Sequence, residues 1–344
     1  MSSRRELNTE YPPPGEQAHI DSLIASLRTK MQGDYAKTRM LRDAHPKMHG
    51  CVHGVFAVLP GLEPDLKVGL FGESRSYPAW IRFSNQNNGV SPDSKPDIRG
   101  VAVKLMGVGG TKLIDSDPGC TTHDFILISD NRFVTKDVAE FDGLVKGMMG
   151  GRVRLAWYFL THPRVLRNLM TSLKKFANPL DIRYFSVAPY LLGARAVKYS
   201  LTPRDAGDTT VPPHPGDDYL KQAMVDRLSA SKVVFDFAVQ FQTDAYLMPI
   251  EDPGIAWNEK DSPFLKVATL TIPAQVFDSA ERAAFGDNLS FNPWRCLAEH
   301  RPLGGISRAR RQVYQALSKF RHEHNRVVQA EPSAEGELAT TAPR

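Results

Sequence analysis

Four short blocks rich in Val, Ile, Leu and Phe follow one another in the first part of the chain, and no helical pattern separates them. Parallel strands need long crossover connections, which are generally helices, so strands this closely spaced are expected to pair as an antiparallel meander or barrel. The spacing therefore favours such a sheet over alternating strands and helices in this region. The blocks are residues 51–59, 78–84, 100–107 and 124–129.

Helices and further strands are expected around this first block. Apolar spacing predicts a helix at 18–34, a helical stretch at 135–176, and a last long helix without internal Gly or Pro at 307–328. Together these segments predict one α+β domain with a helical insertion. Strand character returns at residues 194–201, 232–242 and 265–272.

The two ends differ in composition from the rest of the chain. Residues 1–17 contain three consecutive prolines, which favours an extended lead-in. Residues 331–344 are rich in Glu, Ala, Ser, Pro and Thr and are expected to form a disordered tail. A single domain is therefore predicted over residues 18–330.

Charge and cysteine content exclude several classes of function. The net charge of +5 is mild and much of it lies in residues 308–326, which indicates a local patch without the aromatic residues of a nucleic-acid surface. The three cysteines form no CxxC pair, as expected in a reducing compartment. Because the chain also has no apolar run long enough to span a bilayer and no secretory signal, we expect a cytoplasmic protein without integral membrane association.

The last helix carries an arginine and a tyrosine on one face. Arg310 and Tyr314 are four residues apart, and Arg321 lies seven residues further on. A tyrosine has a pKa of about 10, so a phenolate at neutral pH needs a ferric ion or a nearby guanidinium to stabilise it. Arginines also bind the carboxylates of a heme group. Pairs of this kind are nevertheless common on basic helices that bury a tyrosine, so this motif alone does not decide the chemistry.

Segments near the start of the chain are more specific. Arg42-x-x-His45-x-Lys47 precedes the first strand, Arg82-Phe83-Ser84 closes the second, and residues 97–104 read DIRGVAVK. These segments resemble the R-x-x-H-x-K, V-R-F-S and D-x-R-G-x-A-x-K motifs of the catalase superfamily, in the same order. The resemblance continues through residues 252–270 to Arg310-x-x-x-Tyr314, and it covers residues 40–326. The chain is similar to the small catalase-related heme proteins, because it lacks the arm and the C-terminal domain of a full catalase.

The resemblance implies an antiparallel barrel of about eight strands that binds heme b (iron protoporphyrin IX), with Tyr314 on the last helix as the axial iron ligand and Arg310 as its partner. It implies that His45 is the distal acid/base and that Ser84 hydrogen-bonds its imidazole. By the same resemblance, the heme propionates are held by Arg42, Arg82 and Arg321. Phe133 is a candidate aromatic residue beside the distal pocket, with an ordinary core position as the alternative.

Two features leave alternatives open. One extra residue before the first strand makes His49 a rival of His45, and strand parity favours His45 because His49 and His53 fall on the face opposite Val52. The family's distal asparagine has no counterpart in residues 120–125, where Thr121 or Thr122 takes its place and offers a hydroxyl group instead.

The implied function is a heme-dependent oxidoreductase that breaks down hydrogen peroxide or an organic hydroperoxide. The missing asparagine leaves room for a fatty-acid hydroperoxide isomerase or dehydrase, or for a heme-binding protein with little turnover. The expected partner is a small peroxide or a lipid hydroperoxide, with no nucleic acid, and a homodimer is left open. Three histidines spaced by four residues could bind zinc on a helix, but Pro46 and Gly50 argue against a helix there.

Overall fold

The computed structural model describes residues 5–114, 120–207, 209–329 and 331–332. Its centre is one antiparallel sheet in the order β5-β4-β3-β2-β1-β9-β8-β7-β6, and a pairing between β5 and β7 closes eight of these strands into a ring. The prediction of an antiparallel barrel is confirmed. The strands are β1 (Met48–Val58), β2 (Ser76–Asn85), β3 (Arg99–Leu105), β4 (His123–Ile128), β5 (Tyr184–Phe185), β6 (Tyr190–Leu192), β7 (Arg195–Pro203), β8 (Val233–Phe241) and β9 (Leu265–Ile272).

The barrel closes because its strands alternate between an apolar inner face and a more polar outer face. Val52 and Phe56 of β1, Ile81 of β2 and Val103 of β3 are among the buried residues of the main core. Neighbouring positions such as Arg82 point to the outer face of the same strands. The interior is therefore a packed core, and any ligand of the β1–β4 side lies against the outer face.

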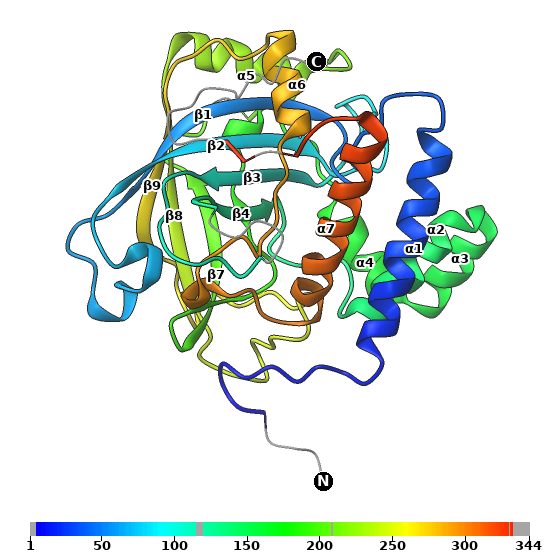
Figure 1. Ribbon diagram of the computed structural model, residues 1–344, viewed down its shortest axis with the longest axis horizontal. Coiled ribbons are helices and arrows are strands. Elements are labelled where there is room, and N and C mark those ends of the chain that lie inside the picture. The colour runs from blue at the N-terminus through cyan, green and yellow to red at the C-terminus, as the bar shows by residue number, and fades with distance from the viewer. Residues whose placement is uncertain (1–4, 115–119, 208, 330, 333–344) are drawn as a thin grey trace.

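Helices cover this outer face. Figure 1 shows α7 between the barrel strands and α1, with α2 and α3 at the far side of α1. The expected insertion forms three helices, and Asp137 begins the first of them by accepting a hydrogen bond from the backbone amide of Glu140. The helices are α1 (Glu16–Asp34), α2 (Val138–Met149), α3 (Gly151–Thr161), α4 (Pro163–Ser172), α5 (Tyr219–Ala230), α6 (Ala280–Asn288) and α7 (Gly305–Asn325). Among the described residues, no helix is long and apolar enough to cross a bilayer.

The N-terminal lead-in is tied to the start of α7 by charge. Arg308 forms ion pairs with Glu10, Glu16 and Glu251, at distances of 2.5, 2.6 and 2.8 Å. Glu16 is already part of α1. The arginine that opens the basic stretch of the last helix is thus neutralised by three carboxylates, and it fixes α1 and the lead-in against α7.

Candidate functional site on the outer face of the barrel

His45 lies just before β1 in a conformation that the sequence does not reveal. Its φ of 62° is in the left-handed region, which is uncommon for a residue with a side chain. Two hydrogen bonds hold it there. The backbone amide of His45 donates to the carbonyl of Gln86 at 3.3 Å, and the side chain of Arg82 donates to the backbone carbonyl of His45 at 2.9 Å. Backbone strain held in this way is often found at functional sites.

The imidazole of His45 turns toward β2 and β3. Its Nδ1 lies 3.0 Å from the hydroxyl of Ser84, as the sequence predicts for a distal histidine and its serine partner. Ser84 pairs with Gly100 across the two strands. A Cβ atom at Gly100 would come within 2.4 Å of His45 Cε1, so the ring rests directly on the glycine backbone. The structure therefore brings His45 and Ser84 together on the outer face.

Three predicted arginines gather beside this pair. Arg82 and Arg321 are buried, and the side chain of Arg42 is 18% exposed. Their charges act on one another: burial and the charges of Arg82 and Arg321 lower the pKa of Arg42, and burial and Arg82 lower the pKa of Arg321 to about 10. Among the described residues, the single ion pair that the three form is Arg42 with Asp287 of α6, at 3.9 Å.

The same positive surroundings act on His45. Burial, followed by the charges of Arg82, Arg310 and Arg42, lowers the pKa of His45 to about 3. The imidazole is therefore neutral at physiological pH and can accept a proton. Because Nδ1 faces Ser84, Nε2 is the nitrogen left to exchange a proton with a bound molecule.

Arg310 and Tyr314 occupy the α7 side of the site. Tyr314 and Phe133 are half-buried and pack against the apolar cluster that α1, α2 and α7 share. Arg310 lies 5.7 Å from the centre of the Phe133 ring, and its buried Nη1 atom has no hydrogen-bond partner in the part of the chain that the structure describes. Since Arg310 also influences the pKa of His45, the two halves of the predicted site lie within electrostatic range of each other.

His49 and the two threonines lie in other surroundings. His49 is buried at the bulge of β1, with Nε2 2.5 Å from Asn85 and Nδ1 3.8 Å from Asp93, so it belongs to a closed polar cluster. Thr121 is exposed and lies two residues before β4. Thr122 is buried and donates a hydrogen bond of 2.9 Å to Glu331.

Glu331 completes a second buried cluster that the sequence did not predict. Its carboxylate lies 2.6 Å from Lys104 and 3.0 Å from Arg295, and both cations also bind Asp124. The first residue of the segment expected to be disordered thus contacts the barrel, whereas residues 333–344 lie outside the described residues. No signal in the sequence pairs positions so far apart. The sequence also did not predict that Asp287 would lie beside the arginines, because α6 has only a weak apolar pattern and was not expected as a helix.

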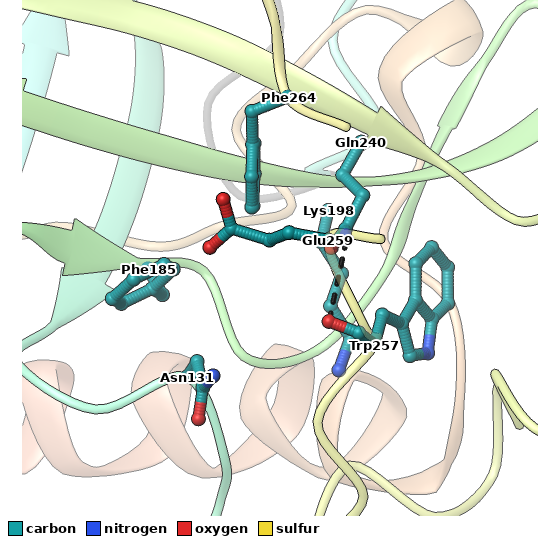
Figure 2. A pocket seen from close by; sticks show the side chains of 7 residues that line it. All are labelled: Asn131, Phe185, Lys198, Gln240, Trp257, Glu259 and Phe264. Atoms are coloured by element: carbon teal, nitrogen blue, oxygen red, sulfur yellow. Dashed lines mark hydrogen bonds between the residues drawn. The ribbon is translucent and has the colours of Figure 1, made fainter. Parts of the chain in front are cut away.

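Two cavities lie away from the predicted site. Figure 2 shows the smaller one, where Lys198 of β7 and Gln240 of β8 face Trp257 beneath Phe264. Burial lowers the pKa of Lys198 to about 7, and Nζ donates to the carbonyl of Ile255 at 3.2 Å. The volume of this cavity, about 10 Å³, leaves room for one water molecule, so the cavity is too small for a substrate. The larger cavity, of about 290 Å³, lies between the lead-in and residues 245–252.

Comparison with known proteins identifies the architecture. The sequence matches no protein-family model and no curated protein. In three dimensions it is similar to a bacterial catalase (TM-score 0.64, 14% identity, covering 94% of this chain and 63% of that one). It is also similar to a fungal catalase (TM-score 0.63, 14% identity, 97% and 68%) and to catalase A from Saccharomyces cerevisiae (TM-score 0.67, 16% identity, 99% and 74%). The chain thus spans less than two thirds of the bacterial enzyme. With its barrel of eight paired strands, flanking helices and ordered motifs, this chain has the catalase-like fold.

Proposed function

We propose that the chain binds heme b between the outer face of β1–β4 and α7, and that it acts on peroxides. The observation that carries the proposal is the group of Arg42, Arg82 and Arg321. Three guanidinium groups with one nearby carboxylate leave an uncompensated positive charge, and burying such a charge is costly unless an anionic partner binds there. The two propionates of heme are a partner of this kind.

Two further features fit the same group. The buried Nη1 of Arg310 has no hydrogen-bond partner among the described residues, so it would be free to pair with an anionic group such as the phenolate that we propose for Tyr314. The close approach of His45 to Gly100 leaves the imidazole standing on the strand surface, facing outward. Tyr314 is the residue that would hold the heme iron through its phenolate oxygen, and Phe133 would line the same space. When bound, ferric heme would supply the electrons for breaking the O–O bond.

His45 would move the proton in this reaction. Because its pKa is low, Nε2 is free to accept a proton from the first peroxide oxygen and to return it to the second as the bond breaks. Ser84 can donate to or accept from Nδ1, so its hydroxyl would hold the ring in place in both protonation states. Bound propionates would offset the arginine charges and so reverse part of the lowering of the His45 pKa, while the larger effect, burial, would remain.

The experiment is a substrate panel on heme-loaded protein, with hydrogen peroxide, an organic hydroperoxide and a fatty-acid hydroperoxide. Oxygen release would assign a catalase, dye oxidation without oxygen a peroxidase, and a rearranged lipid without external reductant an isomerase or dehydrase. The threonines in place of an asparagine favour the organic substrates. A role for Thr121, a homodimer and a cytoplasmic location stay predictions, and the three buried free cysteines agree with a reducing compartment.

His45→Gln is expected to lower turnover by about 10²- to 10⁴-fold while the protein still binds heme, because only the proton transfer is removed. The matched control is His53→Gln, on the next part of β1, where the ring packs against Trp80 at 5.6 Å. Turnover by His45→Gln at the level of the control would refute the assignment. A heme-loaded wild type that turns over none of the substrates would leave a heme-binding protein as the function.

A further inference from the structure

The helical insertion carries an unusual concentration of positive charge. Residues 143–180 contain seven lysines and arginines and no Asp or Glu. The net charge of the whole chain is +5, so the rest of the molecule is net negative. Among the described residues, five of the seven cations are exposed and form no ion pair; they are Arg152, Arg154, Arg167, Lys174 and Lys175.

Large apolar side chains are exposed in the same segment. Val153, Trp157 and Leu160 of α3 are 86%, 67% and 71% exposed. Their spacing of four and three residues places them on one face of the helix. Tyr158 is buried against Gly143 of α2, so the exposed stripe points away from the molecule. Exposed apolar patches of this kind mark interaction surfaces.

The two features are arranged around each other. Arg152 and Arg154 are the immediate neighbours of Val153, so they project on either side of the apolar stripe. Met148 and Met149, at the end of α2, are also exposed and precede α3 directly. Figure 1 shows α3 at the outer edge of the molecule, on the side away from the barrel. An amphipathic helix with this position and charge can lie flat on a large surface.

From this arrangement we infer that α3 docks the protein on the surface of a bilayer that contains anionic phospholipids. The stripe of Val153, Trp157 and Leu160 would enter the boundary between headgroups and acyl chains, where tryptophan is favoured. Arg152 and Arg154 would bind lipid phosphates at the level of the headgroups. The inference does not depend on heme binding, and it adds to the proposed function a route to peroxides that form within membranes.

Other occupants fit the face less well. A second copy that docked through the same face would bring two positively charged surfaces together, and these repel each other. A nucleic acid would bind the cations but would leave the aliphatic stripe exposed to water. An anionic bilayer offers both an apolar layer and negative charge.

The test is co-sedimentation of the full-length protein with phosphatidylcholine vesicles, with and without one third of phosphatidylserine. We expect binding to the anionic vesicles that weakens as salt is added, and little binding to the neutral ones. Trp157 reports the contact, because Trp80, Trp257 and Trp294 are buried. Its emission is expected to shift to shorter wavelength with anionic vesicles, and the shift is expected to be absent in Trp157→Phe.

Two pairs of variants separate the apolar and the charged contributions. Trp157→Gln with Leu160→Gln is expected to weaken binding by about tenfold or more, and Leu247→Gln, at a similarly exposed site outside the insertion, is the control. Arg152→Gln with Arg154→Gln is expected to weaken binding by about 30-fold. Lys67→Gln with Lys232→Gln removes the same charge from exposed positions on loops of the barrel.

The proposal is wrong if the wild type does not bind anionic vesicles, or if the α3 variants bind as well as their controls. It is also wrong if the wild type is a dimer that does not bind vesicles and if Trp157→Gln converts this dimer into a monomer. The exposed face of α3 would then be a contact between two copies of the chain. All substituted side chains are exposed, so the variants should fold, and circular dichroism would check this. Vesicle binding is measured equally well on heme-free protein, so failure of the heme proposal would not affect the result.

Discussion

The arginines beside His45 are held mainly by backbone carbonyl groups. Arg42 donates to the carbonyls of Gly286 and Leu289, and Arg321 donates to those of Asp287 and Leu289. A carbonyl group fixes the direction of a guanidinium without neutralising its charge. The positive charge therefore remains available to an anionic ligand. For this reason we propose that the heme propionates bind there.

The contribution of the second buried cluster to stability can be tested by a substitution of Glu331. In Glu331→Gln, Lys104 and Arg295 would keep Asp124 as their single carboxylate among the described residues, so a buried positive charge would be left uncompensated. We expect the free energy of unfolding to fall by about 2–4 kcal/mol, because removing one partner of a buried ion pair is costly. Urea denaturation followed by circular dichroism measures the change.

The matched control is Glu323→Gln on α7. Glu323 is exposed and lies 3.8 Å from Lys319, an arrangement that contributes little to stability. Its unfolding free energy is expected to stay within about 0.5 kcal/mol of the wild type. If Glu331→Gln were equally harmless, the contact of this segment with the barrel would have no energetic importance.

Strand β3 contributes to the candidate site through Gly100, whose lack of a side chain leaves room for the imidazole of His45. At Gly100 an added Cβ would meet His45 Cε1 at 2.4 Å, so Gly100→Ala must displace the imidazole from Ser84. We expect peroxide turnover to fall by about tenfold or more, because proton transfer depends on the position of the ring. Steady-state kinetics of the heme-loaded variant would measure it.

Gly89→Ala is the control for this substitution, since no atom of the described residues lies within 4 Å of a Cβ at Gly89. It should turn over peroxide like the wild type. Wild-type turnover in Gly100→Ala would mean that His45 can work from another position, which would contradict the geometry described above.

Elements with a strong period could be predicted from the sequence. The expected strands at 78–84 and 265–272 and the last helix correspond to β2, β9 and α7, because alternating or helical apolar patterns continue through them. Strands β5 and β6 have two and three residues, too short for any period. Helix α5 has a weak apolar face, and it is fixed by tertiary contacts such as that of Met224 with the barrel core.

The candidate site divides in a similar way. His45, Ser84 and Arg82 could be proposed from ordered motifs, and the structure brings the three together. Two other features could not be proposed from the sequence. They are the left-handed backbone at His45 and the carbonyls of α6 that orient the arginines, and both depend on segments that meet only in the folded chain. The bulge that buries His49 likewise depends on pairing between β1 and β2.

Several buried histidines couple the stability of the whole molecule to pH. Burial lowers the pKa of His300 to about 3, and it also lowers the pKa values of His45, His49 and His123. In the unfolded chain these groups take up a proton near pH 6.5, whereas in the folded protein they stay neutral to much lower pH. Their stabilising contribution is therefore complete above pH 6.5 and is lost as the pH falls below it.

The expected result is a lower free energy of unfolding for heme-free protein at pH 5 than at pH 7.5. His300 alone should account for about 2 kcal/mol, and the other three histidines act in the same direction. His123→Leu is expected to reduce the dependence on pH, and His214→Gln, at an exposed position, should not. Equal unfolding free energies at the two pH values would show that these histidines are not held neutral.

In the whole molecule, the segment before β1 supplies His45 and α7 supplies Tyr314, and we propose that heme binds between them. The most direct test is to titrate ferric heme into the wild type, into Tyr314→Phe, and into Tyr246→Phe as an exposed control. We predict that the wild type and the control bind one heme per chain with the absorption and electron paramagnetic resonance of a phenolate-ligated ferric iron. Tyr314→Phe should lose that signature and most of its affinity. If Tyr314→Phe binds heme as tightly as the wild type and with the same spectra, the proposed ligand is contradicted.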